Sequence, residues 1–504
     1  MNASVQRASQ ARSFSTVFLI ELWERFGYYG MAALLVLFMV QKLGFDDQKA
    51  NLTWGAFAAL VYAAPAIGGW IGDKVLGARR TLVIGAVVMA LGYGLMAVPS
   101  DNLRLLYCAL GVVVVGNGLF KANSANLVRR IYEGDDASID AAFTWYYMAV
   151  NVGSTLSQLL TPWIAAHYGW HAAFAVCSAG LVLGLLNYLL LRDTLAHVGS
   201  LPDELPVQWG KLLAVLAAGA ATVLVVAFVL QHRGIAVLLV YLAGLVVLGI
   251  FGWLIARGGK GERAGLVAAL VLTMQVILYF IFYQQMTTSL TLFALRNVDW
   301  NQTLFGSHLF TWIPAQYQVL NPLWIFLLSP ALAWLYTRMG RRGNDLPIAA
   351  KFAFGFVMVA AGFFVFGLGG ATAVGGKVSS WYMVLGYGFC SLGELLVSGL
   401  GLAMMARYVP ARMGGFMMGA YYVAVGISQY LGSVVANYAS VPEGVTDPLQ
   451  TLPIYTGLFN RLGVVACGGV LLAVALLPLM RKLSATHREH AVAAGAPETV
   501  VAGR

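Results

Sequence analysis

Five ionisable residues lie inside long apolar stretches of the sequence, where a charged group is costly to bury. They are Glu21, Glu24, Arg25, Lys121 and Glu394. Charged residues in such surroundings are rarely retained without a function. A carboxylate paired with a cation stays ionised, whereas an unpaired and desolvated carboxylate takes up a proton. These residue types therefore have the chemistry needed to couple proton movement to a second event.

The segment ELWERFGYYG holds three of these five residues. Glu21 and Arg25 are spaced i and i+4, so they share one face of a helix and can pair. Glu24 lies about one turn from Glu21 and from Tyr28. A static buried ion pair that serves only the specificity of folding is the alternative interpretation.

The composition identifies the environment in which these residues act. The chain has 504 residues, of which 60% are hydrophobic and 10% are charged, and its mean hydropathy is +0.77. Soluble proteins carry about 25% charged residues, so this chain needs lipid as its solvent. A cytosolic enzyme, a disordered chain and a small secreted scaffold are excluded. The net charge of +10 is not gathered in basic stripes, so no nucleic-acid partner is expected.

The apolar runs are long enough to cross a bilayer as helices, which satisfy their own backbone hydrogen bonds in lipid. They fall at about 14–40, 51–72, 81–99, 103–128, 141–165, 171–191, 211–230, 235–256, 265–294, 316–337, 350–369, 380–406, 413–438 and 457–480. The sequence predicts an all-α integral membrane protein with 14 transmembrane helices. The 6 + 2 + 6 layout indicates two six-helix bundles and a two-helix insertion. This is the arrangement of major facilitator transporters, whose substrate site lies between the halves.

The distribution of basic residues predicts the orientation of the chain, and the long polar break at 192–210 separates the first six spans from the rest. With an internal N-terminus, about three times as many of the 31 Lys and Arg residues lie inside as outside, which places both termini in the cytoplasm. The predicted parts are an N-terminal bundle, a cytoplasmic linker with the insertion, a C-terminal bundle and a cytoplasmic tail. Their ranges are 1–192, 193–263, 264–482 and 483–504.

The loop after the second apolar run, GGWIGDKVLGARRTL, resembles the signature between helices 2 and 3 of major facilitators. We expect Asp73 at a helix N-terminus and paired with Arg79 or Arg80, which would form a latch that depends on the transport state. A plain basic cytoplasmic turn is the alternative.

Five segments resemble motifs of the proton-dependent oligopeptide transporter (POT) family. ELWERFGYYG is similar to ExxERFxYYG, and GNGLFKANSANL is similar to GxGxFKPN with Ala122 in place of proline. FTWYYMAVNVGS resembles FYxxINxGS, QVLNP resembles QxxNP, and SLGELLVSGLGL resembles SxGExxxSPxGL with Gly399 in place of proline. The matches extend from span 1 to span 11, and bacterial members of the family also carry two extra helices.

The resemblance implies a role for each matched residue. Arg25 and Lys121 would receive the peptide carboxylate, and Glu394 would hold the peptide ammonium. Glu21, Glu24 and Arg25 would share proton coupling. The remaining peptide-binding residues implied are Tyr28, Tyr29, Tyr62, Asn151, Asn321 and Ser398.

Three departures from the family pattern affect the expected site. Ala32 stands where an arginine is frequent, and Gln284 and Gln285 stand where its acidic partner is expected, with Asp299 well beyond. We therefore do not expect an outer salt bridge at these positions. Tyr421 stands where an aromatic, frequently tryptophan, is expected.

The sequence thus predicts a symporter that couples inward proton movement to uptake of di- and tripeptides by alternating access. It is expected to work as a monomer in a bacterial inner membrane, with no cofactor, no metal site and no enzymatic activity. The alternatives are a proton-coupled carrier for nitrate, amino acids or drugs, an intramembrane enzyme and a channel. An intramembrane enzyme would need a catalytic pair on facing helices, whereas the paired carboxylates here share one helix. Uptake through a channel would not saturate with solute concentration, unlike uptake by a carrier.

Overall fold

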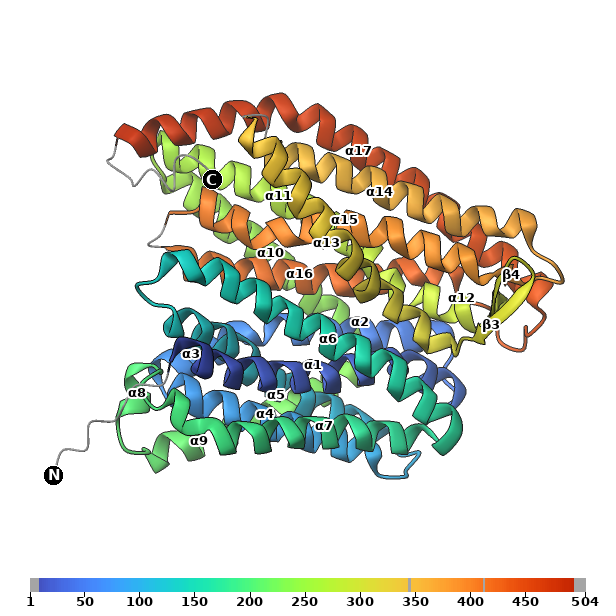
Figure 1. Cartoon of the computed structure of the whole chain (residues 1–504), viewed down its shortest axis with the longest axis horizontal. Helices are drawn as coiled ribbons and strands as arrows, with labels where there is room; N and C mark the ends of the chain where they lie inside the picture. The colour runs from blue at the N-terminus through green and yellow to red at the C-terminus, as the bar shows by residue number, and fades with distance from the viewer. Residues whose placement is uncertain (1–8, 343–345, 411–412, 494–504) are drawn as a thin grey trace. The chain divides into compact units, whose positions relative to one another are not determined.

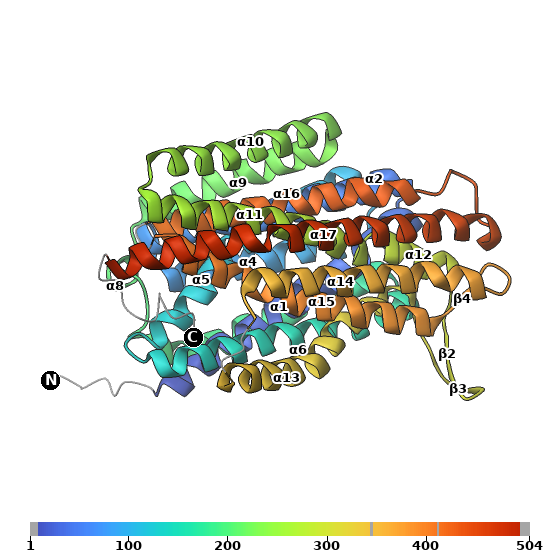
Figure 2. The same cartoon turned by 90° about the horizontal axis from the view of Figure 1, so that it is seen from above.

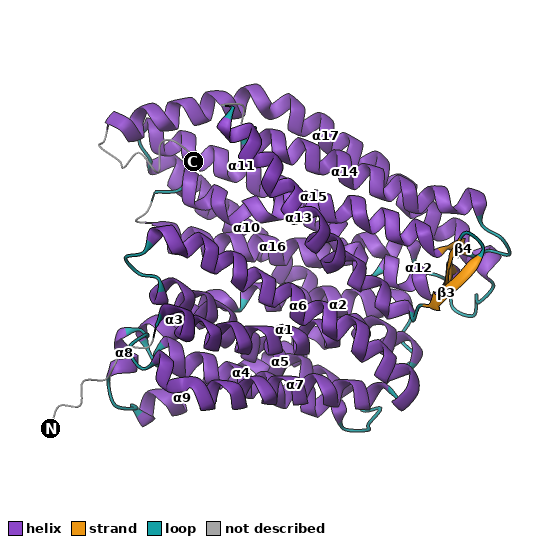
Figure 3. Ribbon diagram, viewed as in Figure 1, coloured by secondary structure: helices purple, strands orange, loops and turns teal. Residues whose placement is uncertain are grey.

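The computed structural model describes residues 9–342, 346–410 and 413–493 and is built almost entirely of helices (Figures 1 and 3). The last residues of the predicted tail, 494–504, lie outside this described part. The all-α prediction is confirmed, and each predicted apolar run coincides with a helix.

Contacts group the chain into two compact units, which are Met1–Gly44 with Ala56–Ala236 and Phe45–Gly55 with Val237–Arg504. The start of α2 therefore belongs to the second unit and its end to the first. The predicted boundaries of the two bundles, the insertion and the tail stay a prediction.

The first unit contains the helices up to α9. Their bounds are α1 Gln10–Gln41, α2 Asp47–Ala63, α3 Pro65–Lys74, α4 Ala78–Ala97, α5 Leu103–Ile131, α6 Asp136–Tyr168, α7 Trp170–Leu191, η1 Arg192–Leu195, α8 Leu201–Glu204 and α9 Trp209–Gln231. Within this unit α1 packs against α6 and α7, and α5 packs against α3, α4 and α9. The site residues Glu21, Glu24 and Arg25 of α1 are buried among these neighbours, and Lys121 of α5 is partly exposed.

The second unit contains the remaining elements. Their bounds are α10 Arg233–Arg257, α11 Lys260–Tyr283, η2 Gln284–Met286, α12 Ser289–Asn297, β1 Val298–Asp299, β2 Asn301–Leu304, β3 Ser307–Thr311, η3 Pro314–Val319, α13 Leu320–Arg341, α14 Ile348–Leu368, η4 Gly369–Thr372, β4 Val378–Ser379, α15 Ser380–Tyr408, α16 Gly414–Ala436, η6 Asn437–Ala439 and α17 Pro448–Ala493. Here α14 packs against α15 and α17, and α15 packs against α11 and α13.

Among the described residues, ten helical segments are long and apolar enough to span a membrane. The protein is therefore a multi-pass membrane protein. The four other predicted spans coincide with α1, α6, α15 and α16, which are not among these ten segments. In α1 the charges of Glu21, Glu24 and Arg25 account for this, so the count of 14 spans stays a prediction.

The short strands were not predicted from the sequence. β1 pairs with β4 in parallel, and β2 forms an antiparallel hairpin with β3 through a two-residue turn. Both pairings lie in the second unit, where α12 leads into α13 and α14 into α15 (Figure 3). The hairpin was missed because no alternation of apolar and polar residues marks so short a segment.

Candidate functional site

The four ionisable residues predicted inside the apolar stretches of the first unit, Glu21, Glu24, Arg25 and Lys121, come together in one cluster. Glu21, on α1, is fully buried. Its Oε1 accepts a hydrogen bond from Lys121 Nζ of α5 at 3.0 Å, and its Oε2 accepts one from Ser124 Oγ at 2.7 Å. Ser124 in turn accepts a hydrogen bond from the Tyr146 hydroxyl of α6 at 3.1 Å. Every oxygen of this carboxylate therefore has a donor.

Arg25 completes the cluster from the next turn of α1. Its Nε lies 3.6 Å from Glu21 Oε1, so the predicted pair of these two residues is present. Its hydrogen bonds, however, go to the carboxylate of the adjacent Glu24, which is also fully buried. The cluster thus contains two buried carboxylates, the buried Arg25 and the partly exposed Lys121. We call the six residues Glu21, Glu24, Arg25, Lys121, Ser124 and Tyr146 the first cluster.

Helix α6 packs closely against α1 beside this cluster. A Cβ atom at Gly153 would overlap the Leu22 carbonyl oxygen and press on the Arg25 side chain, so only glycine allows the observed distance. The motif match of the FTWYYMAVNVGS segment implied a role for Asn151 but not for Tyr146. The signal for Tyr146 was present there, but a sequence does not reveal which tyrosine of the YY pair faces the carboxylate.

Tyrosines surround Arg25 on its other side. The Arg25 guanidinium carbon lies 5.1 Å from the centre of the Tyr28 ring and 5.9 Å from that of Tyr29, within the range of cation–π attraction. Tyr62 is half-buried in α2. Asn151 is buried in α6, where its Nδ2 donates to the Tyr147 carbonyl at 2.8 Å.

A second cluster lies in the second unit and consists of Asn321, Ser391 and Glu394. Asn321 Nδ2 donates to Glu394 Oε2 at 2.7 Å and to Ser391 Oγ at 3.1 Å. The Asn321 and Glu394 predicted from QVLNP and SLGELL are thus in direct contact, and Ser398 is half-buried one turn after Glu394. Among the residues that the structure describes, none forms an ion pair with the Glu394 carboxylate, which therefore keeps its capacity to bind a cation.

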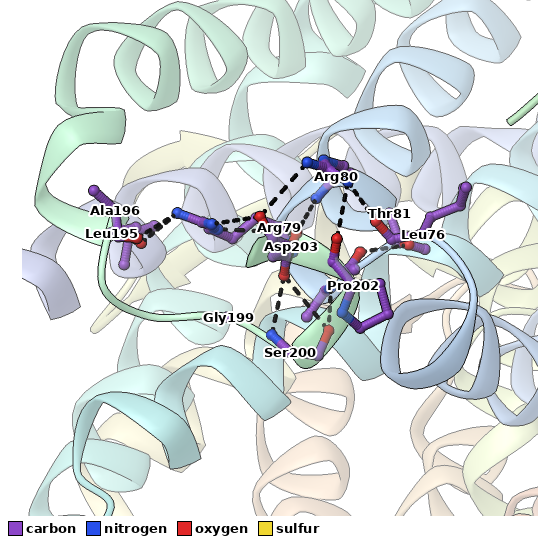
Figure 4. A network of polar contacts seen from close by, with 12 residues as sticks. Leu76, Arg79, Arg80, Thr81, Leu195, Ala196, Gly199, Ser200, Pro202 and Asp203 are labelled. Carbon is purple, nitrogen blue, oxygen red and sulfur yellow. Dashed lines mark hydrogen bonds and ion pairs between the residues drawn. The ribbon is translucent and has the colours of Figure 1, made fainter. Parts of the chain in front are cut away.

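The loop between α3 and α4 binds the segment that follows α7, as Figure 4 shows. The Asp203 carboxylate accepts the backbone N–H of Arg79 at 3.1 Å and lies 3.9 Å from the Arg79 Nε. The Arg79 side chain donates to the carbonyls of Leu195 and Ala196. Arg80 donates to the carbonyls of Pro202 and Leu205.

The predicted pairing of Asp73 with Arg79 or Arg80 is wrong. Asp73 lies in the last turn of α3 rather than at a helix N-terminus, and it accepts hydrogen bonds from Asn126 and Arg130 of α5 at 2.8 and 3.4 Å. The error has a physical cause: Asp203 is distant in sequence but supplies an acceptor at the start of α4. That helix begins after Gly77, which has no side chain to cap it.

A buried ion pair in the second unit was also missed. Arg296 of α12 donates to both oxygens of Asp47, at 2.7 and 2.8 Å, and to the Tyr455 hydroxyl at 2.5 Å. Gln284 and Gln285 hydrogen-bond instead to α16, through Ser433 Oγ and the Gly432 carbonyl. Only the three-dimensional fold brings Asp47 and Arg296 together, because they are 249 residues apart.

No group of three or more His, Cys, Asp or Glu side chains that could hold a metal occurs among the described residues. His167 and His171 each bond to a backbone carbonyl, those of Trp163 and Met96.

Comparison with known proteins finds the same family throughout. The sequence model described as "POT family" matches residues 79–452. Dipeptide and tripeptide permease B of Aliivibrio fischeri is 44% identical over 96% of this chain and 97% of its own. Dipeptide and tripeptide permease A of Citrobacter koseri is 40% identical over 98% of this chain and 97% of its own.

Solved structures resemble the whole chain as well. A crystal structure of tetrameric PepTSo2 has a TM-score of 0.86 and 58% identity, with 94% of this chain and 99% of that chain covered. A structure of the peptide transporter POT with sulfate has a TM-score of 0.81 and 28% identity, with 94% and 95% covered. The predicted major facilitator arrangement is therefore confirmed.

Proposed function

The chain belongs to the POT family, and we propose that it is a secondary active symporter that takes up di- and tripeptides together with protons. Relatives named as dipeptide and tripeptide permeases match it over nearly its full length. The observation that carries the proposal is the first cluster, in which two buried carboxylates are neutralised by two cations.

The substrate class follows from the charges that a peptide presents. A zwitterionic peptide needs donors for its carboxylate and an acceptor for its ammonium group. Arg25 and Lys121 are the cations available for the carboxylate. Glu394, which is oriented by Asn321 and forms no ion pair with any described residue, is the acceptor for the ammonium. Recognition of both termini instead of a side chain accounts for tolerance of many sequences.

The remaining proposed contacts serve the body of the peptide. We assign hydrogen bonds to the peptide backbone and the walls of side-chain pockets to a set of polar and aromatic residues. They are Tyr28, Tyr29, Tyr62, Asn151, Asn321 and Ser398.

Proton coupling follows from competition for the cations. A peptide carboxylate that draws Arg25 or Lys121 toward itself leaves Glu24 or Glu21 buried with a weaker partner. A buried carboxylate without a partner is strongly destabilised as an anion and takes up a proton. Binding of one cargo thereby favours binding of the other, which is the linkage that symport requires.

We place the protein in the bacterial inner membrane with both termini in the cytoplasm and propose that it acts as a carrier, not as an enzyme, with no cofactor besides the coupling proton. Asp73, Arg79 and Arg80 would latch the cytoplasmic side through their present partners. Each side chain proposed for binding comes from one chain, so one subunit can be the functional unit even in a tetramer like that of PepTSo2.

Uptake into proteoliposomes tests this function. With an acidic outside, labelled dialanine should accumulate above its external concentration, and a protonophore should abolish the accumulation. Unlabelled tripeptides should compete, whereas nitrate and free amino acids should not. Accumulation that competes with nitrate or amino acids but not with tripeptides would replace the peptide assignment by that of another solute carrier.

A further inference from the structure

The β2–β3 hairpin of the second unit ends in an apolar tip that local turn chemistry does not favour. Its two-residue turn consists of Phe305 and Gly306, both with positive φ, at 50° and 82°. Turns of this kind favour Asn, Asp or Gly at the first position. Phe305 is the one non-glycine residue with positive φ in the described chain, and it is 99% exposed.

The rest of the hairpin is uncharged and has further exposed apolar side chains. Residues 300–312 contain no Lys, Arg, Asp or Glu. Besides Phe305, the large side chains of Leu304, Leu309 and Phe310 are exposed. A strained backbone at an apolar and fully exposed residue indicates that something outside the chain contacts it.

The base of the hairpin carries a group of tryptophans whose indole N–H groups are satisfied. Trp312 donates to Gln302 Oε1 at 3.0 Å, and Trp381 of α15 donates to the Thr303 carbonyl at 2.8 Å. Trp300 donates to the Ala294 carbonyl at 2.8 Å. Trp312 is buried, whereas Trp300 and Trp381 keep part of their rings exposed. Partly exposed tryptophans with a bonded N–H are typical of the boundary between lipid and water.

The hairpin also lies where lipid headgroups are expected. It follows the candidate span Lys260–Asn297 and precedes the candidate span Pro314–Met339. In Figure 2 the strands leave the ends of the unit's helices sideways, across the direction of those helices. A segment with this course at the end of a span is expected to run along the membrane surface.

The size of the patch favours lipid over a protein partner. The four exposed side chains offer roughly 400 Å² of apolar area, since a whole aromatic side chain buries about 150–250 Å². A stable protein interface uses about 800 Å² on each partner. We propose that the β2–β3 hairpin is an interfacial anchor that inserts Phe305 and its apolar neighbours into the outer headgroup region of the bilayer.

An environment-sensitive label on the full-length protein in proteoliposomes tests the anchor. The labelled variant is Leu309→Cys, with Phe305 intact and with Cys108 and Cys467 replaced by alanine, since Cys177 and Cys390 are buried. The control is Glu443→Cys, in the exposed polar loop before α17. We expect blue-shifted emission, quenching by nitroxide-headgroup lipid and loss of iodide quenching for Leu309→Cys only.

A second variant separates insertion from folding of the hairpin. Phe305→Asn suits the turn better, so the hairpin should still form, but the blue shift and the lipid quenching at Leu309→Cys should decrease. A Leu309→Cys label as accessible to iodide as the control would overturn the proposal. A label shielded from iodide but not quenched by the nitroxide lipid would overturn it in favour of a protein contact.

Discussion

Among single residues, the proposed coupling of peptide and proton depends on how the buried carboxylates of the first and second clusters are compensated. In the first cluster each carboxylate already has a cation, so a ligand must compete for one of them. In the second cluster Glu394 accepts a hydrogen bond from the Asn321 amide and forms no ion pair within the described part of the chain, so it can bind a ligand's ammonium without breaking an ion pair. Removal of a charged group is therefore expected to have different effects on ligand binding in the two clusters.

Substitution of Glu394 tests the cation site. Glu394→Gln should weaken dipeptide binding by roughly 10- to 100-fold, because a hydrogen bond to a charged group contributes about 1.5–3 kcal/mol. Binding is measured by isothermal titration in detergent. The matched control is Glu443→Gln in an exposed loop of the same unit, which should bind normally. Unchanged affinity in Glu394→Gln would remove this residue from the site.

The residues of the clusters were predictable, but several of their contacts were not. The i and i+4 spacing predicted the ion pair between Glu21 and Arg25. The sequence could not show that Lys121 pairs with Glu21 or that Ser124 holds the second oxygen, because these contacts join α1 to α5 across 100 or more residues.

At the scale of elements, the segment after α7 caps a helix that cannot cap itself. α4 begins after Gly77, whose φ of 102° suits glycine and whose missing side chain leaves the first N–H groups without an acceptor. Asp203 and Ser200 supply the acceptors, and Ser200 Oγ also donates to the Gly72 carbonyl at 2.6 Å. The linker thus stabilises the α3–α4 loop within the first unit.

Loss of this cap should lower stability. Asp203→Ala should destabilise the protein by about 1–2 kcal/mol, the usual cost of removing a helix cap, and lower its thermal midpoint in detergent. The adjacent Glu204→Ala is the control, since Glu204 is exposed. If both variants melted at the wild-type temperature, the role of Asp203 as a cap would be wrong.

The helices themselves were predictable from their apolar runs, because a segment long enough to cross lipid has no alternative to a helix. The elements outside the lipid were not. The linker turns η1 and α8 and the β2–β3 hairpin are short, so they depend on tertiary contacts such as those of Arg79 and Trp381.

At the scale of the whole molecule, the low charge content indicated a membrane protein, and the family comparison confirmed a POT transporter. In the proposed mechanism, peptide binding at the first cluster raises the affinity for the proton, and proton binding raises the affinity for the peptide by the same factor. This symmetry is a thermodynamic requirement of coupling. Coupling can therefore be measured with a peptide gradient that drives proton movement, instead of a proton gradient that drives peptide uptake.

The most direct test is proton entry driven by a peptide gradient alone. Proteoliposomes hold a trapped pH dye, have equal pH on both sides and have their membrane potential clamped. Addition of external dialanine should acidify the lumen with saturable kinetics, and Glu21→Gln should admit labelled dialanine with little acidification. Wild-type protein that admits labelled dialanine without acidifying the lumen would contradict proton-coupled symport.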